Sequence, residues 1–398
     1  MKNLSPNTVP GFQLGTAAAG LKDSGKKDIA VVFSETPCTA AGVFTQNLAA
    51  AAPVQVGRRL IRRKHSRGLV VNSGNANACT GNRGLTDAEK MSELTAELTG
   101  AARGNFFPVS TGIIGKKLPM KPLESGIRKC VSGLAPLDLI QLARAIMTTD
   151  TYPKTAFEAI KTRHGTISLG GAAKGSGMIA PNMATMLGFI FTDIAAPGDV
   201  LTELIKSTCN LTFNCVTVDG DTSTNDTVLM FANGISDIRL DDLSAKEAQA
   251  FRAALIRVCR SLCEQIAADG EGATKRVTIS VEKTNTQKEA LQAARAVAES
   301  SLVKTAIAGC DPNWGRIVCA LGYSGVSFRL EDITVSIQGT RVFANGEPVK
   351  FNQSSLEKKL AGDSVDIVIQ LHTGRQEARI WTCDLTKDYV AINADYHT

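Results

Sequence analysis

Two spacings of hydrophobic residues alternate along this chain. Short apolar runs rich in β-branched and aromatic residues are typical of buried strands. Such runs occur at residues 29–34, 68–72, 165–169, 183–191 and 227–231. Between them, apolar side chains recur every three or four positions, which places them on one face of a helix. The chain is therefore predicted to mix strands and helices.

Three of the predicted helices carry a start signal. Thr86–Glu89, Ser244–Glu247 and Thr286–Glu289 each place Ser or Thr three residues before Glu, the spacing of a capping box. The first of these helices is predicted to end at Gly100 and the second at Asp269. Two further amphipathic helices are predicted, at 136–147 and 199–210.

The pattern changes from Arg276 onward. Apolar and polar residues alternate at 277–281, which predicts a strand, and a helix and a further strand follow. Alternation at 333–337 and 365–371 and the hairpin turn signal Asn345-Gly346 predict antiparallel strands. These elements form a smaller C-terminal portion, 276–398, with a structural boundary near residue 275. A turn is also predicted over 310–316, ahead of the apolar run 317–321.

Composition limits the class of protein. Hydrophobic residues make up 43% of the 398 positions and charged residues 21%, which is typical of a globular protein with a sizeable core. The net charge is 44 − 38 = +6, which is too dilute to indicate a nucleic-acid partner. The one dense basic run, 58–67, contains no aromatic residue and is interpreted as a solvated helix face.

The cysteines and histidines predict no metal site. Ten cysteines and four histidines lack the spacing of a zinc site or a disulfide framework, which favours a reducing compartment. The N-terminal residues lack the apolar core of a signal peptide, and no apolar run is long enough to cross a bilayer. We therefore expect a cytoplasmic protein with neither a membrane nor a nucleic-acid partner.

The candidate chemistry centres on residues 174–193, which read Lys-Gly-Ser-Gly-Met-Ile-Ala-Pro-Asn-Met-Ala-Thr-Met-Leu-Gly-Phe-Ile-Phe-Thr-Asp. Glycines release the backbone and proline removes a hydrogen-bond donor, so the left half is predicted to be a loop. The residues behind that prediction are Gly170, Gly171, Gly175, Gly177 and Pro181. The right half is the buried strand predicted at 183–191.

Thr185 lies where this loop meets the strand. Its hydroxyl can attack the carbonyl carbon of Ala184 and convert that peptide bond into an ester. Hydrolysis of the ester leaves Thr185 as a new N-terminus, whose α-amino group, with a pKa near roughly 8, can take the proton of the adjacent hydroxyl. The alternative interpretation is an ordinary threonine at the start of a core strand.

Two other segments carry candidate chemistry, each with a plain alternative. Thr111-Gly112 can aim a hydroxyl and a backbone N–H at one point, as an oxyanion hole requires; otherwise it is a turn after a strand. Glu271, held between two glycines, is either a presented carboxylate or a turn residue at a helix end. The polar tail from Asn393 would be frayed in most proteins.

Eight segments in order resemble the ornithine acetyltransferases (glutamate N-acetyltransferases) of arginine biosynthesis. One such segment could arise by chance, but eight in family order cover nearly the whole chain. They are Thr39–Asn47, Asn72–Ala78, Ser110–Gly115, Thr148–Thr151, Lys174–Leu187, Asp219–Asp226, Asp311–Arg316 and Tyr389–Thr398.

The resemblance implies a fold and a reaction. The fold is an αββα sandwich, similar to N-terminal-nucleophile hydrolases but with its own topology, plus the smaller C-terminal α/β portion. The reaction is ping-pong acetyl transfer from N2-acetyl-L-ornithine to L-glutamate, through an acetylated Thr185. No cofactor is implied, and acetyl-CoA is a possible co-substrate. Self-cleavage would give an α chain, 1–184, and a β chain, 185–398, assembled as a heterotetramer of two α and two β chains.

The resemblance also assigns roles to residues. It places Thr185 as nucleophile, Thr111 and Gly112 in the oxyanion hole, and the cleavage site between Ala184 and Thr185. It assigns substrate binding to Thr148, Lys174, Thr185, Glu271, Asn393 and Thr398.

Three competing classes differ in what they predict. A self-processing amidohydrolase or aminopeptidase with an N-terminal threonine is the runner-up, and it predicts ammonia or peptide products without transfer to glutamate. A nucleotide-binding enzyme is disfavoured because the phosphate-loop order is scrambled in residues 171–176. If the protein were a non-catalytic binding protein, the similarity of the Ala184-Thr185 segment to a cleavage site would be coincidental.

Overall fold

The computed structural model describes residues 8–22, 24–180 and 186–395, and their strands form two sheets. The first sheet contains β1 (Phe12–Ala17), β2 (Ile29–Phe44), β3 (His65–Asn75), β4 (Phe106–Ile113), β5 (Ala135–Pro136), β6 (Lys154–Thr162), β7 (Gly165–Lys174), β8 (Leu187–Thr192) and β9 (Thr227–Ala232). The second contains β10 (Arg276–Thr284), β11 (Thr334–Ile337), β12 (Thr340–Ala344), β13 (Glu347–Pro348), β14 (Ser364–Gln370) and β15 (Gln376–Cys383).

The long strand β2 joins two halves of the first sheet. Its first residues pair with β1 and β3, the register shifts between Phe33 and Cys38, and its last residues, 39–44, pair with β9. One half, β1 to β4, thereby faces the other half, β6 to β9. Their inner faces share one core, in which Phe107 meets Phe231 and Phe12 meets Phe191 edge-to-face.

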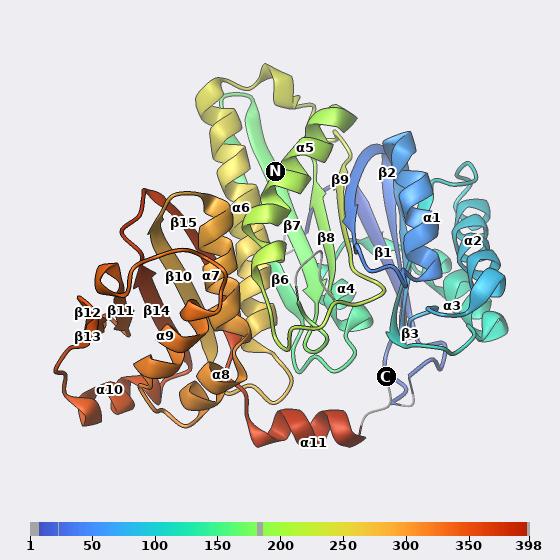
Figure 1. Cartoon of the computed structure of the whole chain (residues 1–398). Coiled ribbons are helices and arrows are strands. Elements are labelled where there is room, and N and C mark those ends of the chain that lie inside the picture. Colours follow the sequence, from blue (N-terminus) through green and yellow to red (C-terminus); the bar gives the residue numbers. More distant parts are fainter. Residues whose placement is uncertain (1–7, 23, 181–185, 396–398) are drawn as a thin grey trace.

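Helices cover both outer faces of this double layer (Figure 1). The helices of this portion are α1 (Ala52–Leu60), α2 (Gly81–Leu98), α3 (Met120–Ser132), α4 (Leu139–Ile146), α5 (Gly198–Leu211) and α6 (Ala245–Ala268). The α2 and α3 helices pack on the outer face of the β1–β4 half, and α5 and α6 pack on that of the β6–β9 half. The α4 helix contributes to the core between the halves. The predicted αββα layer order is therefore confirmed.

The second sheet forms the smaller C-terminal α/β portion. Its strand order is β13-β12-β11-β14-β10-β15, and β10 runs antiparallel to β15 but parallel to β14. Its helices are α7 (Gln287–Glu299), α8 (Ser301–Ala308), α9 (Trp314–Gly322), α10 (Gln353–Leu360) and α11 (Lys387–Asp395). Its core is continuous with the packing around α6, so the two portions share apolar contacts.

Several predicted elements are confirmed close to their predicted positions. Ser244 and Glu247 form the capping box that opens α6, and Thr286 caps α7 by accepting a hydrogen bond from the Glu289 N–H. The helix predicted at 199–210 is α5. Within the described part of the chain, each helix is too short or too polar to cross a membrane.

The capping box predicted at Thr86 is wrong. The helix begins five residues earlier, at Gly81, and Thr86 lies inside it, donating its hydroxyl to the Asn82 carbonyl. A threonine hydroxyl commonly bonds back to the preceding turn in this way. Glycine at position 84 permits the earlier start, because any other residue would place its Cβ only 2.0 Å from the Thr80 hydroxyl oxygen.

The predicted loop also begins later than its glycines suggested. Gly170 and Gly171 belong to β7, which extends to Lys174. A Cβ at Gly170 would approach Leu139 to 2.7 Å, and one at Gly171 would approach Ile190 to 2.6 Å. These glycines therefore serve close packing on both faces of a strand. The predicted turn over 310–316 is likewise cut short, because Asn313 caps α9 and the helix starts at Trp314.

Candidate active site

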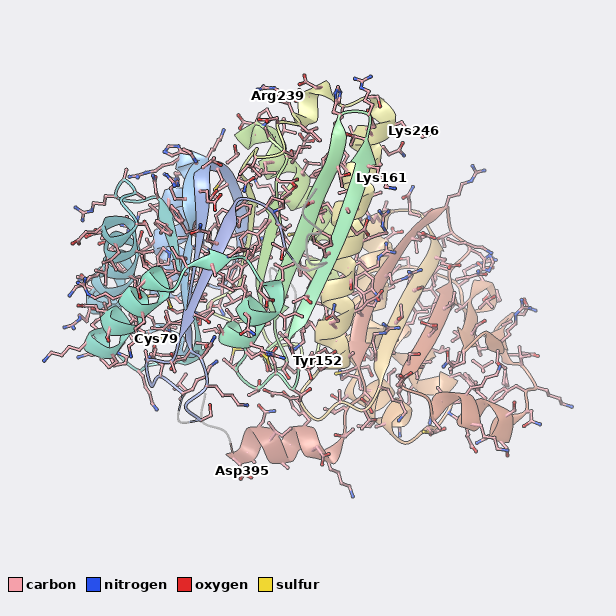
Figure 2. The ribbon with its side chains drawn as sticks, turned by 180° about the vertical axis from the view of Figure 1, so that it is seen from behind. Cys79, Tyr152, Lys161, Arg239, Lys246 and Asp395 are labelled. Atoms are coloured by element: carbon pink, nitrogen blue, oxygen red, sulfur yellow. The ribbon has the colours of Figure 1, made fainter. Side chains whose placement is uncertain are left out.

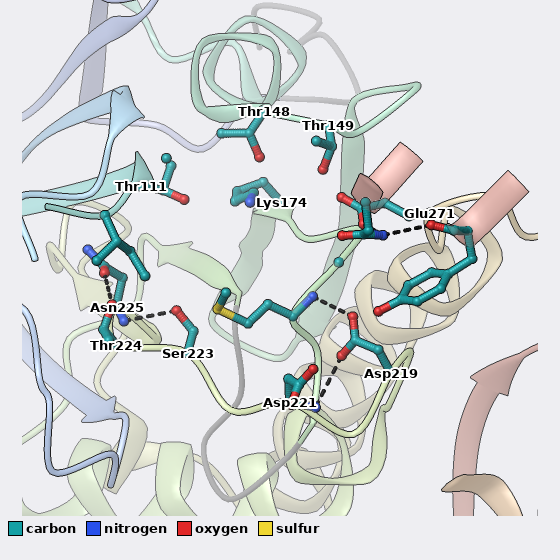
Figure 3. A pocket seen from close by; sticks show the side chains of 16 residues that line it. Thr111, Thr148, Thr149, Lys174, Asp219, Asp221, Ser223, Thr224, Asn225 and Glu271 are labelled. Atoms are coloured by element: carbon teal, nitrogen blue, oxygen red, sulfur yellow. Dashed lines mark hydrogen bonds between the residues drawn. The ribbon is translucent and has the colours of Figure 1, made fainter. Parts of the chain in front are cut away.

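A cavity of about 260 Å³ lies beside the ends of β4 and β7. Tyr152, just before the start of β6, lies at the same end of the molecule as α11 (Figure 2). Lys161 lies toward the opposite end of β6. The residues that line the cavity are Thr111, Gly112, Ile114, Thr148, Thr149, Lys174, Gly177, Met178, Asp219, Asp221, Ser223, Thr224, Asn225, Glu271, Tyr389 and Asn393 (Figure 3).

The structure brings six of the predicted site residues to this one cavity. They are Thr111, Gly112, Thr148, Lys174, Glu271 and Asn393. The other three, Ala184, Thr185 and Thr398, lie outside the described residues. The roles assigned to all nine stay predictions, but the described six come from segments far apart in the sequence.

Thr111 and Gly112 lie at an irregularity between β3 and β4. The register shifts there, so that Asn75 pairs with both Thr111 and Ile113. Gly112 has φ of +133°, and a Cβ on it would lie 2.3 Å from the Gly74 carbonyl carbon. Only glycine fits this backbone. The bulge therefore takes Thr111 and Gly112 out of the regular ladder at the wall of the cavity.

Asn225 supports the same wall and has no role among the sequence-based predictions. Its side-chain amide donates to the carbonyls of Ala76, at 2.7 Å, and Ser110, at 2.8 Å. Ser110 in turn donates to the Asn72 side chain at 2.6 Å. The Asp219–Asp226 segment is one of the family motifs, but the sequence does not show that the side-chain amide of Asn225 in it supports β4.

A buried ionic cluster lies behind Thr148 and Lys174. The Lys154 ammonium is fully buried and pairs with Asp150 at 2.7 Å and with Asp269. Asp150 also accepts the N–H groups of Thr148, at 2.9 Å, and Gly175, at 2.7 Å. Three cavity segments, those of Thr148, Lys174 and Glu271, therefore meet around one ammonium group.

Electrostatics in this cluster favour an ionised Asp150 beside Lys174. Burial acts to raise the pKa of Asp150, but the positive charges of Lys174 and Lys154 outweigh burial and lower it to about 2. Burial lowers the pKa of Lys174, which Asp150 partly offsets. Lys174 is 4% exposed, so an anionic ligand that reaches it would favour the protonated form of a poorly hydrated amine.

Replacing Lys154 by methionine should destabilise the protein by about 3–5 kcal/mol, because two buried carboxylates lose their partner. Urea unfolding monitored by circular dichroism measures this loss. The matched control is Arg257→Met, which breaks the Arg257–Glu158 pair; the Arg257 side chain is 55% exposed, so its loss should cost at most about 1 kcal/mol. Equal effects in the two variants would show that the buried cluster is not a stabilising centre.

Glu271 is presented into the cavity by its glycine neighbours and by α11. Its backbone N–H donates to the Ser176 carbonyl at 2.9 Å. A Cβ on Gly177 would lie 2.2 Å from a Glu271 carboxylate oxygen, so glycine is needed for that approach. The Asn393 amide donates to the same carboxylate at 2.9 Å. Glu271 thus lies in the turn that follows α6, and its carboxyl group also reaches the cavity wall, so both interpretations of this residue hold.

The cavity presents both basic and acidic side chains. Lys174 supplies an amino group near Thr148, and Glu271, Asp219 and Asp221 supply carboxyl groups elsewhere on its wall (Figure 3). Asp219, Asp221 and Tyr389 were absent from the predicted site residues. Such a wall can hold a small molecule that bears both a carboxylate and an ammonium group. The fold and the cavity thus define an α/β protein with a site for small zwitterions of the amino-acid type.

Comparison with known proteins identifies the family. The model of the ArgJ family matches residues 13–398, and the chain belongs to this family. The prediction of the ornithine acetyltransferase family is thereby confirmed, together with the prediction of an enzyme of arginine biosynthesis.

Individual relatives agree with the family match. The arginine biosynthesis bifunctional protein ArgJ of Symbiobacterium thermophilum is 44% identical over 394 residues, which cover 98% of each chain. The protein of the same name from Oceanobacillus iheyensis is 41% identical and covers all of this chain and 97% of its own. A crystal structure of ArgJ from Bacillus halodurans superposes with a TM-score of 0.51 and 42% identity, covering 53% of this chain and 100% of its own.

Proposed function

We propose that this enzyme transfers an acetyl group from N2-acetyl-L-ornithine to L-glutamate through an acetyl ester on Thr185, which forms after self-cleavage between Ala184 and Thr185. The observation that carries the proposal is the convergence of Thr111, Gly112, Lys174 and Glu271 on one cavity. Met178, on the approach to the predicted cleavage site, lines the same cavity.

The first half-reaction acetylates the enzyme. The Thr185 hydroxyl attacks the acetamide carbonyl of acetylornithine, and the free α-amino group of Thr185 accepts the hydroxyl proton. The Thr111 hydroxyl and the Gly112 N–H donate to the oxyanion of the tetrahedral intermediate. The C–N bond then breaks, the proton passes to the departing nitrogen, and ornithine leaves. The second half-reaction reverses these steps, with the amine of glutamate as nucleophile.

Lys174 and Glu271 recognise different charged groups of the substrate. Lys174 pairs with the α-carboxylate, which acetylornithine and glutamate share, and Glu271 meets the ammonium group of the ornithine side chain. Glutamate lacks that ammonium group, so its side-chain carboxylate requires a different partner. This division of labour is consistent with the cavity, where the two residues come from separate segments.

Cleavage between Ala184 and Thr185 would give an α chain of 184 residues and a β chain of 398 − 184 = 214 residues. By the resemblance alone, we further assign a heterotetramer of two α and two β chains, a cytoplasmic location, and acetyl-CoA as a possible second acetyl donor.

A coupled assay tests the proposed reaction. Purified enzyme with N2-acetylornithine should release ornithine continuously only when glutamate is added, and N-acetylglutamate should accumulate in equal amount. Steady release of acetate without glutamate would instead establish an amidohydrolase, the competing class.

Replacing Asn393 by alanine should raise the KM for acetylornithine about tenfold, because the lost hydrogen bond to a carboxylate is worth roughly 1.5 kcal/mol or more. Initial rates over a range of acetylornithine concentrations measure this. The control is Val390→Ala on the same helix, whose side chain is exposed. If Asn393→Ala leaves KM at the Val390→Ala value, Asn393 has no part in orienting Glu271.

A further inference from the structure

The loop of residues 216–226 contacts the described residues on both sides of the predicted cleavage site. On the N-terminal side, the Asp219 carboxylate accepts the N–H groups of Met178, at 2.6 Å, and Ile179, at 2.8 Å. The Val218 N–H donates back to the Ile179 carbonyl at 2.7 Å, and the Thr222 hydroxyl donates to the Ala180 carbonyl at 3.2 Å. The chain is thus fixed to the loop up to residue 180.

The same loop fixes the chain on the C-terminal side. The Asp226 carboxylate accepts the N–H of Met186 at 3.0 Å. Directly after the loop, the N–H of Thr227, the first residue of β9, donates to the Met186 carbonyl at 3.1 Å. Met186 is joined to Thr185 by one peptide bond. The Asp226 carboxylate therefore holds the peptide group that directly follows the predicted nucleophile.

Two further observations set Asp226 and its loop apart. Asp226 is 2% exposed, and its carboxyl group lies beside the Thr45 side chain as well as accepting the Met186 N–H. A buried carboxyl group is costly unless such partners offset the loss of water. The loop is also braced from outside, since the side chains of Thr45 and Asn47 donate to the carbonyls of Ser223 and Thr222.

We propose that loop 216–226 is a cradle for self-cleavage, in which Asp219 and Asp226 are positioning residues that hold the two flanks of the cleavage site. The inference rests on the proposed self-cleavage and deepens it. The contacts fix residues 178–180 and residue 186, the described residues on the two sides of the Ala184-Thr185 bond, and so orient the chain for the proposed cleavage. Orientation of this kind accounts for large factors in rate.

The hydrogen bonds predict a specific ranking of variants. Asp219 uses both carboxylate oxygens, so Asp219→Asn, which offers one acceptor, should slow cleavage about 100-fold. Asp226 uses one oxygen, so Asp226→Asn should stay within about tenfold of wild type, whereas Asp226→Ala should lose about 100-fold. The matched control is Asp193, a buried aspartate beyond the other end of β8 that accepts the Ser168 N–H at 2.8 Å. Burial raises the pKa of Asp193 as it does that of Asp226, and Asp193→Ala should cleave at the wild-type rate.

Intact-mass time courses of freshly synthesised full-length chains measure these rates. Unfolding temperatures of the same variants in an uncut Thr185→Ala background separate cleavage from stability, because Asp226→Ala and Asp193→Ala should lower that temperature alike. Wild-type cleavage in Asp219→Asn and Asp226→Ala would overturn the inference, as would equal slowing in Asp193→Ala or equal rates in Asp226→Asn and Asp226→Ala. A wild-type chain that never cleaves would instead overturn the proposed function itself.

Discussion

A Thr185→Ala variant should remain a single polypeptide and release no ornithine from acetylornithine above the uncatalysed background. Two functions are lost together. Without the hydroxyl there is no attack on the Ala184 carbonyl, and without cleavage there is neither an acyl acceptor nor a free α-amino base. Ornithine release in the presence of glutamate measures the effect.

The matched variant is Thr185→Ser, which keeps a hydroxyl at the same position. It should be cut and should transfer acetyl at a reduced rate. Acetyl transfer by Thr185→Ala at a rate near wild type would contradict the proposal, because the acetyl group would then have another acceptor. Loss of acetyl transfer in both variants would leave the Thr185 hydroxyl without a demonstrated role and would also count against the proposal.

Thr111→Val should lower kcat by about two to three decades, the usual effect of removing one oxyanion donor. Valine has nearly the shape of threonine, so packing at this buried position, 7% exposed, is largely retained. The KM for acetylornithine should change little, since the oxyanion develops only after binding. Steady-state kinetics on the purified variant separate the two parameters.

The control for that experiment is Thr202→Val in α5, where the hydroxyl donates to the Gly198 carbonyl within the helix. Its turnover should equal that of wild type. Normal turnover in Thr111→Val would remove Thr111 from the site. A rise in KM with unchanged kcat would make it a ground-state binding residue instead.

The sequence predicted best where the signal is local. The capping box at Ser244 requires only a serine and a glutamate three residues apart, and it opens α6 as expected. Thr86–Glu89 has the same spacing but lies inside a helix that begins at Gly81. The difference arises one turn earlier, where Gly84 lies close against Thr80, the residue that precedes the helix, and the spacing of Thr86 and Glu89 does not include that contact.

The sequence does not show whether a glycine serves a special backbone conformation or close packing. Gly112 was singled out, and its positive φ at the β3–β4 bulge shows why no other residue fits. Gly170 and Gly171 are predicted in a loop, but they are strand positions where the missing side chain leaves room for Leu139 and Ile190. Backbone freedom and close packing call for the same residue, and only the fold distinguishes them.

The candidate site was predictable as a set of residues but not as a network. Six of its members came from the resemblance to known motifs. The Lys154 ammonium, around which the Thr148, Lys174 and Glu271 segments meet, pairs with Asp269, 115 positions away. Asn225 reaches Ala76 across 149 positions. No spacing rule spans such distances, so these supporting residues appear only once the chain is folded.

The most direct test of self-cleavage at Thr185 is the intact mass of the purified wild-type protein, followed by a second spectrum after incubation with acetylornithine alone. The first spectrum should show two chains whose masses correspond to residues 1–184 and 185–398. The second should show the 185–398 chain heavier by one acetyl group, with the other chain unchanged. A single uncut mass after prolonged incubation, or an acetyl group on the 1–184 chain, would contradict the assignment of Thr185 as the nucleophile.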